Sequence, residues 1–192
     1  MLTIIPKWFI RYKFFNSLFL GLSVGAIFTL YAPLEPSIYS LGGVFLALAM
    51  LIVARFYKQI LNAEWFFRIS LFVEVVLVIA ILYFLYHQYS YQTALLMYIG
   101  YQITFIFGSY LIRAETLLLK TDELLTQLDT AKQLGYLFGM GISYIFYKIL
   151  EFYSVESNQI QVYNLHFLLL GVEIIVIFLI LKSFRRTYWE KK

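Results

Sequence analysis

The sequence predicts an all-α membrane protein in which six helices cross the bilayer. The chain has 192 residues, of which 62% are hydrophobic and 14% charged, whereas soluble domains are about 45–50% apolar and about 25% charged. Its apolar residues gather into long runs with almost no charge, and these runs do not alternate as the strands of a membrane barrel would. The composition therefore excludes soluble enzymes, nucleic-acid binders and disordered scaffolds.

Six apolar runs define the expected spans of a single transmembrane domain, residues 1–192. Each run holds 17 to 20 residues, which matches the 17–25 residues that a helix needs to cross the hydrocarbon core. The only formal charges within them are Glu74, Lys148 and Glu173. The expected spans cover residues 14–31, 37–54, 69–86, 93–112, 134–150 and 165–181.

The positive charges predict the orientation of these spans. With the N-terminus in the cytoplasm, 14 of the 15 Lys and Arg residues fall on the cytoplasmic side, and Lys148 is the exception. Cytoplasmic segments are enriched in Lys and Arg, so we expect both termini in the cytoplasm. The first apolar run exceeds the core of a signal peptide and has no small-residue cleavage site after it, so we expect it to be retained. We expect a multi-pass protein of the cell inner membrane.

The cytoplasmic stretch 113–132 differs from the rest of the chain because it mixes leucines with charges. Its leucines fall on one side of a helical wheel, opposite Lys120, Asp122, Glu123 and Asp129. This pattern predicts an amphipathic connector that lies at the membrane surface or packs beneath the bundle. A docking site for a regulator is the alternative interpretation.

A short pattern recurs in the third and sixth apolar runs. Val73-Glu74-Val75-Val76-Leu77-Val78-Ile79 matches Val172-Glu173-Ile174-Ile175-Val176-Ile177, and the two glutamates are 173 − 74 = 99 residues apart. Three helices followed by three that cross in the opposite sense are typical of an inverted repeat. Chance recurrence of common membrane residues is the alternative.

Two stretches resemble the major facilitator superfamily of transporters. Residues 31–60, YAPLEPSIYSLGGVFLALAMLIVARFYKQI, are similar to its second helix, which leads into a basic cytoplasmic turn. Residues 131–145, AKQLGYLFGMGISYI, resemble its fifth helix, with closely spaced Gly135, Gly139 and Gly141. The family's motif after helix two is not met, because residues 54–59 keep the basic residues but lack the glycine and the acid.

The resemblance implies one six-helix half of a transporter that needs a second half around a central cavity. We therefore expect a homodimer or a partner half, with glycines such as Gly139 and Gly42 at the interface. In that family helices one, four and five line the cavity, whereas helices three and six support it. Carried over, this implies a small-molecule cavity lined by Asn16, Ser23, Tyr98, Gln102, Ser109, Tyr136, Ser143 and Tyr147.

Glu74 and Glu173 each lie near the middle of a span. An ionised carboxylate there costs about 2.5–3.5 kcal/mol on insertion scales, so each glutamate must be protonated, paired or in contact with water. Proton coupling or cation binding is the functional interpretation. A hydrogen bond between helices is the structural alternative.

The sequence contains no recognisable catalytic or cofactor motif. It has no cysteine, and its two histidines have no third ligand at metal spacing, so we expect neither an enzyme nor a metal or cofactor protein. We expect a half-size, proton-coupled secondary transporter of a small molecule, with the lipid bilayer as its surroundings and no nucleic-acid partner. The alternative is a non-transporting membrane scaffold or assembly subunit.

Overall fold

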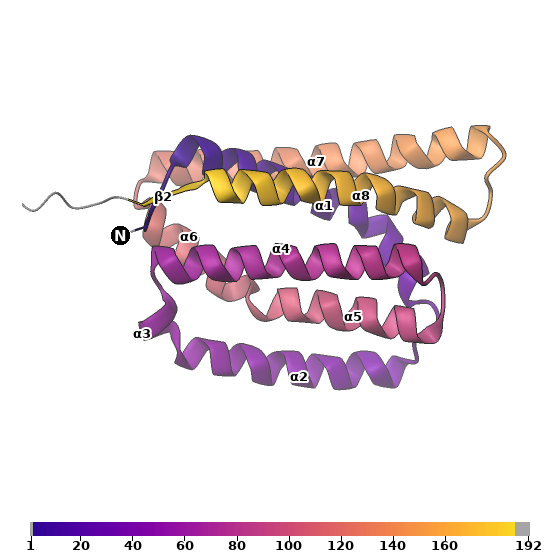
Figure 1. Ribbon diagram of the computed structural model, residues 1–192, viewed down its shortest axis with the longest axis horizontal. Coiled ribbons are helices and arrows are strands. Elements are labelled where there is room, and N and C mark those ends of the chain that lie inside the picture. The colour runs from indigo at the N-terminus through magenta and orange to yellow at the C-terminus, as the bar shows by residue number, and fades with distance from the viewer. Residues whose placement is uncertain (1, 187–192) are drawn as a thin grey trace, which may run out of the picture.

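The computed structural model describes residues 2–186, and the chain there is a bundle of long helices (Figure 1). Two short strands, β1 (Leu2–Ile4) and β2 (Phe184–Arg186), flank the helices. The helices are α1 (Pro6–Tyr31), α2 (Pro36–Arg55), α3 (Tyr57–Ile60), α4 (Ala63–Tyr86), α5 (Tyr91–Ile106), α6 (Gly108–Leu119), α7 (Asp122–Phe152) and α8 (Asn158–Lys182).

Local sequence signals start most of the long helices. Pro6 and Pro36 occupy the first positions of α1 and α2, where the missing N–H is not needed. Asn62 caps α4 by accepting hydrogen bonds from two backbone N–H groups, at 3.2 and 3.1 Å. Ser90 and Thr121 cap α5 and α7 in the same way. These caps satisfy N–H groups that the first helical turn leaves unpaired.

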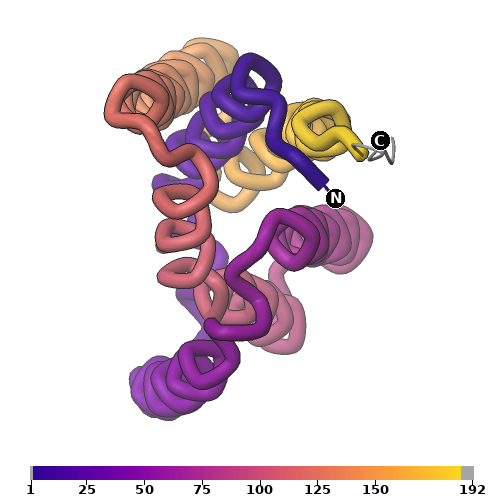
Figure 2. The backbone as a smooth tube through the Cα atoms, turned by 90° about the vertical axis from the view of Figure 1, so that its left-hand side faces the viewer, coloured from indigo at the N-terminus to yellow at the C-terminus, as the bar shows by residue number. Residues whose placement is uncertain are grey.

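Helix α1 is central to the packing of the bundle. It packs against α7 and α8, while α4 packs against α8 and α5, and α2 packs mainly against α5. In Figure 2, α4 and α8 lie on one side of α1 and α5, and α2 and α7 lie on the other. The main core contains buried aromatic side chains such as Phe9, Phe66 and Phe84, whereas α2 contributes no buried residue.

Glycines bring the backbones of α1 and α7 into direct contact. A Cβ added at Gly139 would lie 2.9 Å from the backbone nitrogen of Leu22, and one at Gly21 would lie 3.0 Å from that of Met140. Gly135 faces the backbone of α1 in the same way. The expectation that Gly135 and Gly139 form an interface between subunits is therefore wrong, because a helix of the same chain occupies that face.

Gly42, the other glycine expected at an interface between subunits, also contacts a helix of the same chain. The ring of Tyr98, on α5, covers Gly42 so closely that a Cβ there would overlap it, whereas Gly43 has open space around it. Gly25 of α1 faces the ring of Tyr147, 3.5 Å from the position of an added Cβ. Small residues in this chain thus mainly serve packing within the bundle.

Five helical segments of the described chain are long and apolar enough to cross a membrane: α1, α2, α4, the α5–α6 segment and α8. The sixth predicted span, 134–150, lies within α7, which runs along most of the bundle (Figure 1). Helix α7 is not among the helices whose length and apolar composition mark them as candidate spans. The predicted count of six is therefore not confirmed.

The expected connector 113–132 is not a helix of its own. Its first part completes α6, the chain turns at Lys120 with a φ of 60°, and its second part is the beginning of α7. Leu119 and Leu128 are buried in the main core, so these leucines pack within the bundle and do not face a membrane surface. The stretch joins two helices of the bundle directly.

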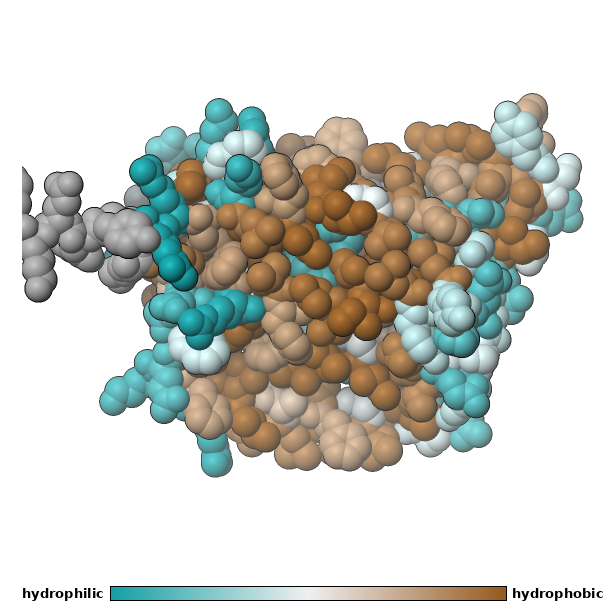
Figure 3. Space-filling model, in the orientation of Figure 1, coloured by the Kyte–Doolittle hydropathy of each residue, from teal (hydrophilic) through white to brown (hydrophobic). Residues whose placement is uncertain are grey.

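The two strands were not expected from the sequence. β1 and β2 pair in antiparallel register, Thr3 opposite Arg185, and the backbone N–H of Ile5 donates to the carbonyl of Ser183 at 2.8 Å. Both ends of the described chain therefore lie at the same end of the bundle. Figure 3 shows a broad apolar belt between two hydrophilic ends, as expected for a membrane protein. Which end faces the cytoplasm stays a prediction.

Candidate functional site

Two buried carboxyl groups meet between α4 and α8. Glu74 is 1% exposed and Glu173 is fully buried, and their side chains lie within hydrogen-bonding reach of each other. They come together because α4 and α8 pack side by side. The sequence predicted both residues as candidates for proton or ion coupling, but it did not predict that they touch.

Helix α1 supplies two donors to this carboxyl pair. The hydroxyl of Tyr12 donates to Oε1 of Glu74 at 2.6 Å, and the amide of Asn16 donates to the same oxygen at 3.1 Å. Tyr12 and Asn16 are four residues apart and therefore share one face of α1. Asn16 was expected to line a substrate cavity, and it binds Glu74 instead. Tyr12 was missed, although its spacing from Asn16 is a signal that could have suggested it.

Three oxygens of the pair lack a donor. Oε2 of Glu74 and both carboxyl oxygens of Glu173 are buried without a hydrogen-bond partner among the described residues, and so is the hydroxyl of Ser70. If both carboxyl groups were ionised within hydrogen-bonding reach of each other and away from water, they would repel each other strongly. A proton on one carboxyl supplies the missing donor and links the two groups. The arrangement is therefore suited to holding at least one proton.

A cluster of alternating charges lies beside this pair, towards the end of the bundle that holds the termini. Lys13 forms an ion pair with Glu115, and their side chains are only 7% and 4% exposed. Lys132 is 3.0 Å from the other oxygen of Glu115 and 3.4 Å from Asp129. Lys13 also acts electrostatically on Glu74. The cluster thus connects the partly exposed Lys132 to the buried carboxyl pair.

The electrostatics of Lys132 are dominated by its neighbours. Burial favours the neutral amine, but the Glu115 and Asp129 carboxylates outweigh burial and raise the pKa of Lys132 above its usual value. The sequence did not predict this cluster. Lys13, Glu115 and Lys132 lie outside the apolar runs, where charged side chains are expected to be in contact with water. Lys13 and Glu115 are buried where α1, the end of α6 and the beginning of α7 are joined by the ion pairs of Glu115 with Lys13 and Lys132.

Of the other expected cavity residues of α1 and α5, Ser23 and Tyr98 form hydrogen bonds within the bundle. Ser23 is buried, and its hydroxyl donates to the carbonyl of Leu20 at 2.9 Å. The hydroxyl of Tyr98 donates to the carbonyl of Tyr39 at 3.3 Å. Gln102 keeps one buried side-chain oxygen without a partner. These three residues therefore do not form one polar wall.

The expected cavity residues of α6 and α7 are also spread over the molecule. Ser109 lines a surface cavity of about 450 Å³ next to Arg113. Tyr147 lines another, of about 360 Å³, where α1, α7 and α8 meet near the end of the bundle opposite the termini. Tyr136 is half-buried and Ser143 is buried. The single shared cavity remains a prediction that these positions do not support.

The histidines do not add a metal site. His166 is buried, its Nδ1 lies 2.7 Å from the carbonyl of Val162, and its ring packs against Phe84. His87 is exposed in the connection between α4 and α5. Among residues 2–186, no three His, Asp or Glu side chains come together as metal ligands.

Comparisons with known proteins identify no relative of this chain. No family model matches the sequence, and neither a curated protein nor a solved structure is significantly similar to it. The functional interpretation therefore depends on the buried carboxyl pair and on the packing around it.

Proposed function

We propose that the chain is half of a proton-coupled secondary transporter, that it works as a homodimer or with a partner half, and that Glu74 and Glu173 hold the exchanged proton. The observation that carries this proposal is the buried contact of the two carboxyl groups, three of whose oxygens lack a donor. Ionisable groups in the interior of a membrane bundle are expensive and usually mark a functional site.

The helix contacts support a bundle built from two inverted halves. Suppose that α1, α2 and α4 form one half and that the α5–α6 segment, α7 and α8 form the other. In this division α1 corresponds to the α5–α6 segment, α2 to α7 and α4 to α8. The contact of α1 with α7 then corresponds to that of α5 with α2, and the contact of α1 with α8 corresponds to that of α5 with α4. The contact of α4 with α8 maps onto itself. Such a correspondence is typical of inverted-repeat transporters, and it makes Glu74 and Glu173 equivalent positions.

The hydrogen bonds of Glu74 suggest how a proton could act on the bundle. Tyr12 and Asn16 connect α1 to Glu74, and Lys13 lies close enough to stabilise a negative charge there. Loss of the proton would strengthen the attraction of α1 for the pair, whereas uptake would weaken it. Since α1 also packs against α7, a shift of α1 would reach the side of the bundle formed by α2 and α7 (Figure 2).

A non-transporting scaffold is the second candidate, and one observation favours it. Two of the polar residues expected in a cavity are engaged internally, Asn16 by Glu74 and Ser23 by the backbone of Leu20. In addition, glycines hold α1 and α7 in backbone contact. A scaffold would use the carboxyl pair only as a hydrogen bond between helices.

Cysteine accessibility separates the two functions without knowledge of the substrate. The chain contains no cysteine, so Gln102→Cys in liposomes can be labelled with a membrane-impermeant thiol reagent at acidic and neutral pH. His87→Cys, in an exposed connection, corrects for the pH dependence of the reagent. A transporter predicts that the corrected labelling of position 102 changes several-fold with pH, and that Glu74→Gln or Glu173→Gln removes the change. Labelling that does not respond to pH would support the scaffold.

A further inference from the structure

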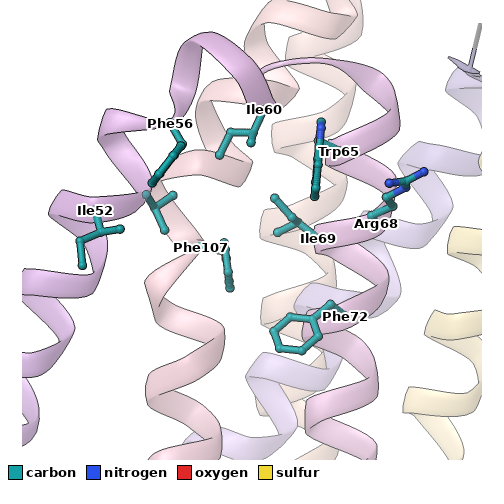
Figure 4. Close-up of a pocket in the computed structure, with 9 residues that line it drawn as sticks. Ile52, Phe56, Ile60, Trp65, Arg68, Ile69, Phe72 and Phe107 are labelled. Carbon is teal, nitrogen blue, oxygen red and sulfur yellow. The ribbon is translucent and has the colours of Figure 1, made fainter.

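An apolar cleft separates α2 from α4 near the end of the bundle that holds the termini (Figure 4). Its volume is about 430 Å³, within the usual range of small-molecule sites, about 300–1,000 Å³. Val53 and Phe56 line it from the α2 side, Ile69 and Phe72 from α4, and Phe107 from the junction of α5 and α6. Ile69 and Phe72 point from α4 into the space towards α2.

The setting of the cleft indicates an apolar occupant. Helix α2 packs mainly against α5 and has no buried residue, and the walls of the cleft are apolar side chains apart from Trp65 and Arg68. Water would find almost no polar partner on these walls, and empty apolar space loses dispersion contacts. The hydrocarbon chain of a lipid is the apolar molecule that surrounds the apolar belt of a protein in a membrane.

The mouth of the cleft is positively charged. Arg68 lines the cleft, stacks 5.4 Å from the ring centre of Trp65 and pairs with Glu64 at 2.7 Å. Arg55 and Lys58, at the end of α2 and in α3, are exposed and have no ion pair within residues 2–186. Arg55 precedes the lining residue Phe56, and Lys58 lies between the lining residues Phe56 and Ile60, so three cations and one carboxylate lie in the lining or next to it along the chain. Their net positive charge is complementary to a phosphate group.

We propose that this cleft binds one acyl chain of an anionic phospholipid, and that Arg68 holds its phosphate together with Arg55 and Lys58. Trp65 lies at the level where the chain meets the headgroup, which is the usual depth of tryptophan in membranes. The lipid fills the space that α2 leaves beside α4 and fixes the position of α2. This binding does not depend on whether the protein transports a substrate.

Quenching of Trp65 fluorescence tests the proposal. The chain has three tryptophans, so Trp8→Phe with Trp189→Phe leaves Trp65 alone. In lipid nanodiscs, small amounts of brominated phosphatidylglycerol or brominated phosphatidylcholine are added as quenchers. We expect the apparent association constant to be about fivefold larger for the anionic lipid. This factor is the contribution of roughly one Lys or Arg side chain near an anionic headgroup. Arg68→Gln should clearly reduce this preference, whereas Arg11→Gln, at a basic position on α1 that does not line the cleft, should leave it unchanged.

A second pair of variants tests the acyl-chain site itself. Val53→Phe fills the cleft from α2, while Val44→Phe places the same side chain on the exposed surface of that helix. Val53→Phe should weaken quenching by the anionic lipid several-fold, and Val44→Phe should not. Equal quenching by both lipids in every variant would mean ordinary surrounding lipid and would overturn the proposal. No quenching by either lipid would mean that protein covers the cleft, and would overturn it as well.

Discussion

The contact between α1 and α7 yields a sharp prediction about two neighbouring glycines. In Gly139→Ala, the new Cβ would lie 2.9 Å from the backbone nitrogen of Leu22 and 3.0 Å from Cα of Gly21. Because the atoms it meets belong to a backbone, α1 must move away, and overpacking of this kind typically costs about 1–3 kcal/mol. Gly141→Ala is the matched control, since no atom lies within 4 Å of its added Cβ.

Helix propensity favours both substitutions equally. Alanine stabilises a helix by about 1 kcal/mol relative to glycine, so Gly141→Ala should be more stable than the natural protein by up to that amount. Gly139→Ala should be less stable than Gly141→Ala by about 1–3 kcal/mol, the overpacking cost alone. Reversible unfolding in lipid bicelles measures this difference. Equal free energies of unfolding for the two variants would refute the direct backbone contact of α1 and α7.

Three further predictions concern the buried polar groups. Tyr12→Phe removes a donor to Glu74 and should lower the free energy of unfolding by about 1–3 kcal/mol, measured in the same bicelles; no change would argue against the hydrogen bond. Lys13→Met leaves Glu115 buried with a single partner and should destabilise by about 3–5 kcal/mol, with much of the loss recovered by also changing Glu115→Leu; strictly additive effects would contradict the buried pair. The pKa of Lys132 is raised above 10.5, so its stabilising contribution is complete below pH 10.5 and is lost as pH rises through the raised value. Lys132→Met should therefore reduce the loss of stability above pH 10.5, and an unchanged alkaline profile would count against this ion pair.

The sequence predicted the apolar helices well because hydropathy is a local property. The runs around Glu74 and Glu173 lie within α4 and α8, as expected. Both glutamates were singled out because a charge in an apolar run is rare and costly. Their contact depends on how α4 packs against α8, and no local pattern in either helix encodes that.

Other features depended on packing partners that the sequence does not name. Gly139 was assigned to an interface between subunits, but a small-residue face can equally serve a neighbouring helix of the same chain. Lys13 and Glu115 are about a hundred residues apart, and nothing near either one predicts that they are buried together. The turn at Lys120 likewise makes part of the expected amphipathic connector the beginning of α7.

We propose above all that Glu74 and Glu173 hold a proton between them inside the helix bundle. Infrared difference spectroscopy of the protein in liposomes at neutral pH tests it directly, because a protonated carboxyl has its own carbonyl band. We expect such a band in the natural protein, a shifted band in each of Glu74→Gln and Glu173→Gln, and none in the double variant. A natural protein without the band at neutral pH, or a double variant that keeps it, would show that the two carboxyl groups do not share a proton.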